Sequence, residues 1–327
     1  MHKKDLVYYG LTLILLLTSF TAKASSDPLP SWNEGTVKQS IIQFVHNTTD
    51  KNSTHYVAPE NRIATIDNDG TMWVEYPMYT QVIFAFARVV ALAPQHPEWK
   101  TQQPFAAVLA KQYDTLTGPE FEKILAATQS GMSVENFKAL AQQWLAIAKD
   151  PRFHQHYTQL VYVPMLEMIN YLRQNNFKVY IVSGGGQDFM RAFTQKTFQL
   201  SPEQIIGSAA KTRYSYQDGR ADLIKIPQLL LVDDKDGKPE AIYFFIGKKP
   251  IIAIGNSEGD RQMLEWTQSN PEEHLMLLVH HDDAVREYAY DTKSKVGTFP
   301  TSLMNEAKEQ HWLVISMKKD WKKIFSF

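Results

Sequence analysis

Two carboxylates stand close together in the segment Asp67-Asn68-Asp69-Gly70-Thr71, directly after the compact apolar run 62–66. Such a run is typical of a buried strand, which would deliver both side chains at its carboxyl end. Gly70 permits a sharp turn behind them. One carboxylate can take a phosphoryl group as an aspartyl-phosphate, while the other protonates the leaving oxygen and later deprotonates water. A metal ion would hold the two roles apart.

The same five residues could instead form a calcium loop or a plain turn. In an EF-hand loop the glycine is sixth and a glutamate closes the loop at position twelve, whereas Gly70 is fourth in this segment. The calcium loop therefore fails on spacing. The solvated turn remains the alternative, and the apolar strand in front of Asp67 argues against it.

Three later segments repeat the pattern of an apolar strand followed by small and polar residues. Residues 177–182 run into Ser183-Gly184-Gly185-Gly186, residues 250–254 run into 255–260, and residues 275–279 run into 280–283. Helix-like stretches separate them. Because ligands bind at the carboxyl ends of strands in open parallel sheets, we predict an α/β fold with helices on both faces of the sheet.

The chain changes character between Thr71 and about residue 151, where long helix-like segments dominate. We interpret residues 72–151 as a helical cap inserted into a core made of residues 25–71 and 152–327. The segment Gln217-Asp218-Gly219-Arg220 predicts a β-hairpin, because Asp-Gly between strand-like residues favours a two-residue turn.

The composition excludes several classes of function. The chain has 327 residues, 44% of them hydrophobic, and a formal net charge of −1. This is globular composition without the basic footprint of nucleic-acid binding, so a small phosphorylated metabolite is the expected partner. The absence of cysteine excludes disulfides, thiol nucleophiles and Cys-ligated metal sites.

The first residues predict export. Lys3 and Lys4 precede an apolar run at 6–20, and Ala22-Lys23-Ala24 follows. This pattern indicates a signal peptide, residues 1–24, cleaved after Ala24, and the bacterial periplasm as the destination. The alternative, an uncleaved anchor, is disfavoured because the run is short of the roughly 20 apolar residues that a spanning helix needs. No stable membrane association is expected after cleavage.

Taken together, the motifs resemble the haloacid dehalogenase superfamily, and most closely its phosphoserine-phosphatase-like branch with a helical cap. The resemblance covers about residues 62–283. It implies a Rossmann-like core, Mg²⁺ and an aspartyl-phosphate intermediate. By that resemblance Asp67 is the nucleophile and a metal ligand, while Asp69 is the general acid and base and binds the metal through its backbone carbonyl.

The second family motif is a Ser or Thr that binds the phosphoryl oxygens, and it falls on Ser183. The glycines after it, beginning with Gly184, let backbone N–H groups approach an anion at a helix N-terminus. We therefore expect Ser183 and Gly184 to hold the transferred group.

The third family motif is a lysine that neutralises the nucleophile and the transferred charge. Lys238 opens a helical stretch before the last motif strand, as in the family. Lys248 and Lys249 directly precede that strand, which would put them at its amino end, away from the site. We prefer Lys238, and the other two remain open.

The fourth family motif is acidic and here reads Gly255-Asn256-Ser257-Glu258-Gly259-Asp260. Asn256 stands where the family usually has an aspartate. An amide oxygen binds a hard cation but brings no charge, so either magnesium affinity is lower or Asp260 takes a larger share. We expect Asn256 and Asp260 to complete the metal site, and helix capping by Asn256 is the alternative.

Glu75 and Trp73 follow the first motif and are candidate substrate contacts. In phosphoserine-specific relatives a glutamate near this position contacts the substrate ammonium, although a solvated Glu75 and a merely packed Trp73 are alternatives.

The leading hypothesis is magnesium-dependent hydrolysis of a small phosphate monoester. Asp69 weakens a dehalogenase interpretation, because halide displacement has no leaving oxygen to protonate. A phosphotransferase with the same core residues is one alternative. The other, motivated by Asn256 and the uncertain lysine, is a noncatalytic exported protein that binds phosphate or metal.

Overall fold

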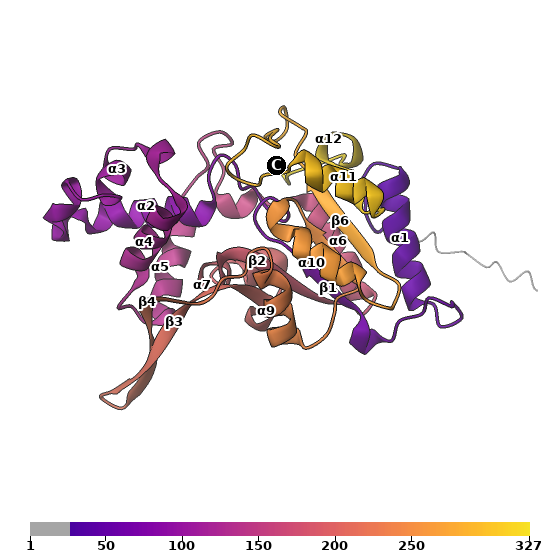
Figure 1. The fold of residues 1–327 in the computed structure, drawn as a ribbon, viewed down its shortest axis with the longest axis horizontal. Helices are drawn as coiled ribbons and strands as arrows, with labels where there is room; N and C mark the ends of the chain where they lie inside the picture. Colours follow the sequence, from indigo (N-terminus) through magenta and orange to yellow (C-terminus); the bar gives the residue numbers. More distant parts are fainter. Residues whose placement is uncertain (1–26) are drawn as a thin grey trace, which may run out of the picture.

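The computed structural model describes residues 27–327, so the predicted signal peptide lies outside the described residues. Its centre is a seven-stranded sheet with the order β4-β3-β2-β1-β5-β6-β7 (Figure 1). All neighbouring strands are parallel except β3 and β4. The strands are β1 Ile63–Ile66, β2 Lys178–Gly186, β3 Ile205–Gln217, β4 Arg220–Leu231, β5 Ile252–Gly255, β6 Leu275–His280 and β7 Leu313–Ser316. The predicted α/β class is confirmed.

The strand register explains why the motif residues meet. Ile66 of β1 lies opposite Ile181 of β2 and Ile254 of β5. The residues that follow these three positions therefore leave the sheet at the same edge. Asp67 is the first residue beyond β1, and its backbone N–H still donates to the Ile254 carbonyl at 2.9 Å.

Helices cover both faces of the sheet, because alternate residues of each strand point to opposite sides. Ile252 and Ile254 pack in one apolar cluster with α1 and α6, whereas Ala253 between them packs in the other cluster with α9, α10 and α11. The core helices are α1 Thr36–Thr49, α6 Val163–Gln174, α7 Gln187–Met190, α8 Thr194–Phe198, α9 Gly237–Ile246, α10 Arg261–Gln268, α11 Thr301–Glu309 and α12 Met317–Asp320.

Four helices between β1 and β2 stand apart from the sheet, at the left of Figure 1. They are α2 Thr80–Leu92, α3 Phe105–Leu109, α4 Gly118–Gln129 and α5 Val134–Ile147. Helices α2, α3 and α4 share an apolar cluster of their own, built around Val89, Trp99 and Ile124, whereas α5 packs in the same cluster as the core. We call α2 to α5 the cap; its predicted limits at residues 72 and 151 stay a prediction.

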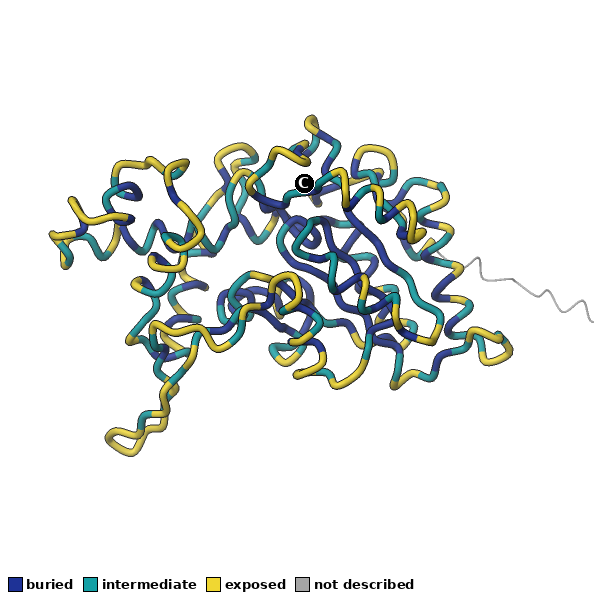
Figure 2. The backbone as a smooth tube through the Cα atoms, viewed as in Figure 1, coloured by how far each residue is buried: buried dark blue, intermediate teal, exposed yellow. Residues whose placement is uncertain are grey.

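The hairpin β3–β4 links the core to the cap. Asp218 and Gly219 at its turn have positive φ, 50° and 78°, as a two-residue hairpin turn requires, so the hairpin prediction is confirmed. Its tip is exposed (Figure 2). Farther along β4, the Lys225 N–H donates to the Met132 carbonyl and the Gly131 N–H donates to the Lys225 carbonyl, each at 2.9 Å. The hairpin is thereby tied to the loop between α4 and α5.

The described chain ends on the core. Strand β7 and the short helix α12 are its last regular elements, and Trp321, Ile324 and Phe325 after them pack in the core cluster. Among residues 27–327, no helix is long and apolar enough to cross a membrane.

Candidate active site

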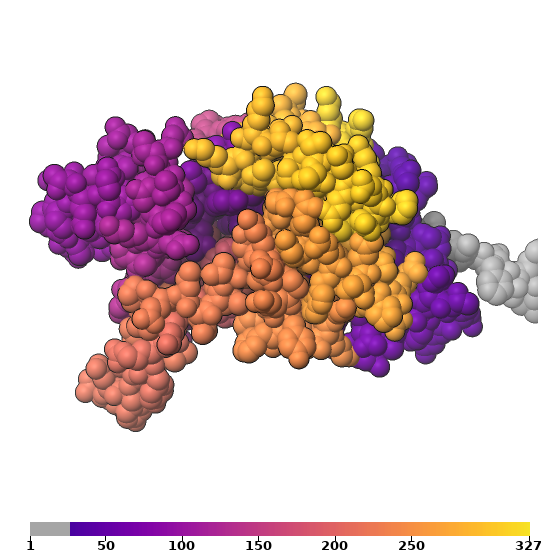
Figure 3. Space-filling view, in the orientation of Figure 1, coloured from indigo at the N-terminus to yellow at the C-terminus, as the bar shows by residue number. Residues whose placement is uncertain are grey.

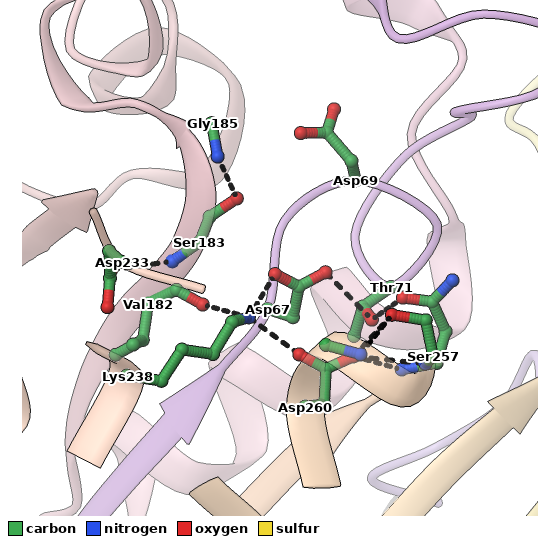
Figure 4. Close-up of polar contacts among 12 residues, drawn as sticks. Asp67, Asp69, Thr71, Val182, Ser183, Gly185, Asp233, Lys238, Ser257 and Asp260 are labelled. Atoms are coloured by element: carbon green, nitrogen blue, oxygen red, sulfur yellow. Dashed lines mark hydrogen bonds and ion pairs between the residues drawn. The ribbon is translucent and has the colours of Figure 1, made fainter. Parts of the chain in front are cut away.

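A buried lysine joins two aspartates at the carboxyl edge of the sheet. Lys238 Nζ donates to Asp67 Oδ1 at 2.7 Å and to Asp260 Oδ1 at 2.6 Å (Figure 4). Its third hydrogen bond goes to the Val182 carbonyl at 2.9 Å. Lys238 lies in the first turn of α9, so the helix start aims its side chain beneath the ends of β1 and β2. The three charged groups form one fixed unit.

Burial and pairing act in opposite directions on these charges. Burial raises the pKa of the Asp67 carboxyl, and the Lys238 ammonium opposes that effect. For Lys238, burial disfavours the ammonium, but the Asp260 and Asp67 carboxylates outweigh it, so its pKa lies above the ordinary value. Lys238 therefore stays a cation beside Asp67.

Asp260 has both carboxylate oxygens engaged. Oδ1 accepts from Lys238, and Oδ2 accepts the backbone N–H groups of Asn256 and Ser257 at 2.9 and 3.0 Å. The loop after β5 therefore wraps around Asp260 and orients it toward the lysine. Its predicted role as a metal ligand remains a prediction.

Asp69 points away from the Lys238 ion pairs (Figure 4). Its Oδ1 accepts a hydrogen bond from Trp73 Nε1 at 2.7 Å, and the Trp73 ring is fully buried and stacked on Phe193 with ring centres 4.3 Å apart. Burial raises the pKa of Asp69 to about 6. A carboxyl with that pKa can hold a proton and release it near neutral pH, as a general acid and base must.

Ser183 is placed by the residues around it. Its backbone N–H donates to Asp233 Oδ2 at 3.1 Å, and its hydroxyl accepts the N–H of Gly185 at 3.2 Å. Both contacts fix the last residues of β2, which continues to Gly186, whereas the sequence predicted that the strand ends before Ser183. The side chain faces the same cavity as Asp67.

One cavity of about 360 Å³ collects most of the predicted residues. Its lining includes Asp67, Asp69, Glu75, Ser183, Gly184, Lys238 and Asp260. Trp73 and Asn256 lie behind this lining. Figure 3 shows a recess between the cap, in purple, and the orange part of the core.

The family model of haloacid dehalogenase-like hydrolases matches residues 64–265, a span that holds all of these site residues. The chain belongs to this family. No curated protein sequence matches it closely enough to be called a relative.

The fold of this hydrolase is similar to that of solved structures. A conserved protein of unknown function from Anaerococcus prevotii is 15% identical, with a TM-score of 0.57 over 91% of this chain and 98% of that chain. A protein of unknown function from Bordetella pertussis is 13% identical, with a TM-score of 0.49 over 78% of this chain and 98% of that chain. A probable phosphoserine phosphatase from Vibrio cholerae is 13% identical, with a TM-score of 0.38 over 79% and 68%.

The oxygen atoms at the hydrolase site fit a hard cation. The Thr71 hydroxyl contacts both Asn256 Oδ1, at 3.0 Å, and Asp67 Oδ2, at 3.5 Å, so these two oxygens converge on one point. Carboxylate, amide and carbonyl oxygens are ligands that Mg²⁺ accepts. Within residues 27–327 no cluster of three or more His, Asp or Glu side chains forms a metal site. Magnesium would therefore need Asp67, the Asp69 carbonyl and the Asn256 amide together.

Glu75 is held inside the protein. Its Oε1 accepts hydrogen bonds from Asn256 Nδ2 and from the Tyr290 hydroxyl, each at 2.7 Å, and the residue is 2% exposed. Burial, together with the charges of Asp69 and Asp67, raises the pKa of Glu75 well above its usual range. Gly70 must be glycine beside it, because φ is 74° and an added Cβ would lie 2.3 Å from Glu75 Oε1.

The other two candidate lysines lie elsewhere. Lys248 is exposed and donates to Asn61, which precedes β1 and so lies at the end of that strand opposite Asp67. Lys249 donates to Ser269, after α10. Only Lys238 of the three reaches the cavity.

Sequence reasoning missed two supporting groups. Asp233 is fully buried, and burial raises its pKa to about 7. The acidic string 233–236 just before Lys238 was a signal for it. His281 contacts the Gly70 carbonyl at 2.7 Å and Glu287 at 3.1 Å. No sequence pattern predicted this contact. His281 is one of two adjacent histidines, and nothing in the sequence indicates which of them faces Gly70.

Proposed function

We propose that this hydrolase cleaves phosphate monoesters through an aspartyl-phosphate on Asp67. The observation that carries the proposal is that Asp67, Asp69, Ser183 and Lys238 line one cavity, with Lys238 bound to only one of the two Asp67 oxygens. The other oxygen, Oδ2, has a single long contact, to Thr71. The Asp67 carboxylate can therefore attack phosphorus with one oxygen while the other remains available to the metal.

In the first step, a carboxylate oxygen of Asp67 forms a bond to phosphorus while the bond from phosphorus to the alcohol oxygen breaks. The proton on Asp69 passes to the departing oxygen, so the alcohol leaves neutral. Ser183 and Gly184 would hold the phosphoryl oxygens. Lys238 balances the charge at Asp67 throughout.

In the second step, Asp69 is a carboxylate and takes a proton from water as the water oxygen bonds to phosphorus. The acyl-phosphate bond to Asp67 breaks, which releases inorganic phosphate and restores both aspartates. Magnesium, bound by Asp67, the Asp69 carbonyl and Asn256, would supply positive charge to the phosphoryl oxygens. Metal dependence is part of the proposal.

Hydrolysis of p-nitrophenyl phosphate, with added magnesium and with a chelator, tests this proposal. The Asp67→Asn variant should lose at least about a thousandfold in kcat, because the nucleophile is gone. Asp222→Asn, on β4 away from the cavity, is the matched control and should keep full activity. Equal rates for Asp67→Asn and wild type would refute the assignment.

Two alternatives have distinct outcomes in the same assay. Adding an alcohol such as glycerol would divert phosphate to the alcohol if the enzyme were a phosphotransferase. A noncatalytic binding protein would bind phosphate without releasing p-nitrophenol. Release of inorganic phosphate that is insensitive to added alcohol supports the hydrolase.

We also propose that the chain is exported to a bacterial periplasm. Support comes from the basic residues, apolar run and small residues at 3–24. Expression of the full chain in a bacterium, followed by fractionation and N-terminal sequencing, should give a periplasmic protein that begins at Ser25. A protein that keeps its first 24 residues would contradict cleavage.

A further inference from the structure

A second cavity adjoins the catalytic one. Its volume is about 460 Å³, against about 360 Å³ for the cavity that holds Asp67. The two share part of their lining, including Gln81, Leu125, Gly184 and Leu229, so a ligand can extend from one into the other. We call the second cavity the side chamber.

The side chamber lies between the cap and the hairpin. Its walls come from α4 and α5 on one side and from β3, β4 and α7 on the other (Figure 1). The backbone bonds between Lys225 and the loop at Gly131 and Met132 hold these walls together. Gln81 of α2 accepts the N–H of Gly186 at 2.7 Å and so stands at the junction with the catalytic cavity.

The walls are mostly apolar. Leu125 and Ala126 of α4, Phe137 of α5, Phe189 of α7 and Ala210 of β3 all line the side chamber. A cavity of this size holds a group as large as a small drug molecule, and apolar walls favour the burial of apolar surface.

The buried charge inside the side chamber is compensated. Lys225 is 3% exposed and is paired with Asp188, and its Nζ lies 4.8 Å from the ring centre of Phe137. Glu122 and Lys123 of α4 are exposed to solvent, and Lys123 donates to the Gln103 carbonyl. A charged group on the ligand would have to compete with the pair of Lys225 and Asp188, and burial of an unpaired charge is costly.

Phosphoserine would leave the side chamber empty. The residue expected to bind its ammonium, Glu75, lines the catalytic cavity and not the side chamber, and is already held by Asn256 and Tyr290.

We propose that the preferred substrates are phosphate monoesters of bulky, uncharged, largely apolar alcohols, whose alcohol part occupies the side chamber. This inference rests on the proposed phosphatase function. The phosphate would lie at Asp67 and Ser183, and the ester oxygen would lie near Asp69 at the junction.

A comparison of 1-naphthyl phosphate, ethyl phosphate and O-phosphoserine tests the inference. We expect kcat/KM for 1-naphthyl phosphate to exceed that for either small substrate by at least about tenfold, because only the naphthyl group fills the side chamber. The difference in leaving-group reactivity is removed by a second comparison, between 2-(1-naphthyl)ethyl phosphate and ethyl phosphate, both of which release an alkyl alcohol.

Filling the side chamber supplies the structural control. Ala126→Trp should lower kcat/KM for 2-(1-naphthyl)ethyl phosphate by about tenfold or more and leave ethyl phosphate within about twofold. Ala127→Trp is the matched control, since Ala127 is the next residue of α4, is exposed and does not line the cavity. Ala210→Phe fills the side chamber from the opposite wall. It provides an independent test if Ala126→Trp does not fold.

The outcomes separate the two proposals. If no phosphate monoester is hydrolysed, the proposed function fails. Two results would overturn the side-chamber assignment and leave the phosphatase function in place. The first is an equal kcat/KM for ethyl phosphate, phosphoserine and the naphthyl esters. The second is an equal loss of kcat/KM for all substrates in Ala126→Trp and Ala210→Phe.

Discussion

His281 Nε2 donates a hydrogen bond to the backbone carbonyl of Gly70, 2.7 Å away, because a carbonyl oxygen can only accept. The other ring nitrogen, Nδ1, lies 3.1 Å from Glu287 Oε2, and both residues are buried. Gly70 directly follows Asp69. A loop after β6 thus holds the turn that carries Asp67 and Asp69, the two aspartates of the proposed mechanism.

Removal of this support should lower turnover more than substrate binding. We expect His281→Leu to reduce kcat by about tenfold with little change in KM, since a small displacement of Asp69 weakens proton transfer but leaves the phosphate-binding groups in place. The variant also leaves the buried Glu287 without its His281 partner. The free energy of unfolding, measured by urea denaturation, should therefore fall by about 1–3 kcal/mol.

His281→Gln separates positioning from simple packing. The glutamine amide can still donate to the Gly70 carbonyl, so this variant should recover most of the kcat lost in His281→Leu. A kcat that tracks only the loss of stability, whichever residue replaces His281, would contradict the positioning role.

Lys238 should be indispensable where Lys248 is not. Lys238→Met leaves Asp67 and Asp260 buried beside each other without a cation, and we expect kcat to fall by about 10²–10³-fold. Lys248→Met alters only an exposed contact with Asn61 and should change kcat by less than about twofold. A similar loss of kcat in both variants would point to a nonspecific effect of charge.

The pH dependence should report on Asp69. Its pKa is raised to about 6, so the proton needed for the first step is lost as the pH rises through that value. For ethyl phosphate, kcat should therefore fall by about tenfold per pH unit above about 6. The p-nitrophenolate leaving group needs no proton, so kcat for p-nitrophenyl phosphate should fall much less over the same pH range. Likewise, Asp69→Asn should lower kcat for ethyl phosphate much more than kcat for p-nitrophenyl phosphate. Parallel pH profiles for both substrates would contradict the acid role.

Much of the site follows from local sequence pattern. Asp67 and Ser183 each end an apolar strand, and parallel strands present their carboxyl ends at one edge, so their convergence is predictable without coordinates. The position of Lys238 was predicted in the same way, because a helix start lies at the carboxyl edge whereas the residues before β5 lie at the other. These predictions need only strand direction and order.

The supporting contacts could not be predicted in this way. The bond from Ser183 to Asp233 spans 50 residues, and the bond from His281 to Gly70 spans 211. Such contacts depend on how loops outside the strands fold back, and loops carry no periodic signal. Glu75 and Trp73 show the same limit: the bonds of their side chains to Asn256 and Asp69 could not be predicted from their positions next to the motif, and their contact with substrate stays a prediction.

The partnership of Asn256 with Glu75 explains how an amide fits where the family usually has an aspartate. Asn256 Nδ2 donates to Glu75 Oε1 at 2.7 Å while Oδ1 accepts from Thr71 at 3.0 Å. An aspartate at this position would place a second carboxylate against Glu75 in a buried site, where like charges repel strongly.

An aspartate at position 256 should therefore improve the metal site only when Glu75 is replaced as well. We expect Asn256→Asp to lower thermal stability without tightening magnesium binding, because the new carboxylate is opposed by Glu75. Asn256→Asp with Glu75→Gln should restore the hydrogen bond with donor and acceptor exchanged, recover stability and bind magnesium about tenfold more tightly than wild type, since the site gains a charged ligand. Calorimetric titration with magnesium and thermal unfolding of the four proteins in the cycle measure both effects. Additive effects of the two substitutions would show that Asn256 and Glu75 act independently and would refute the coupling.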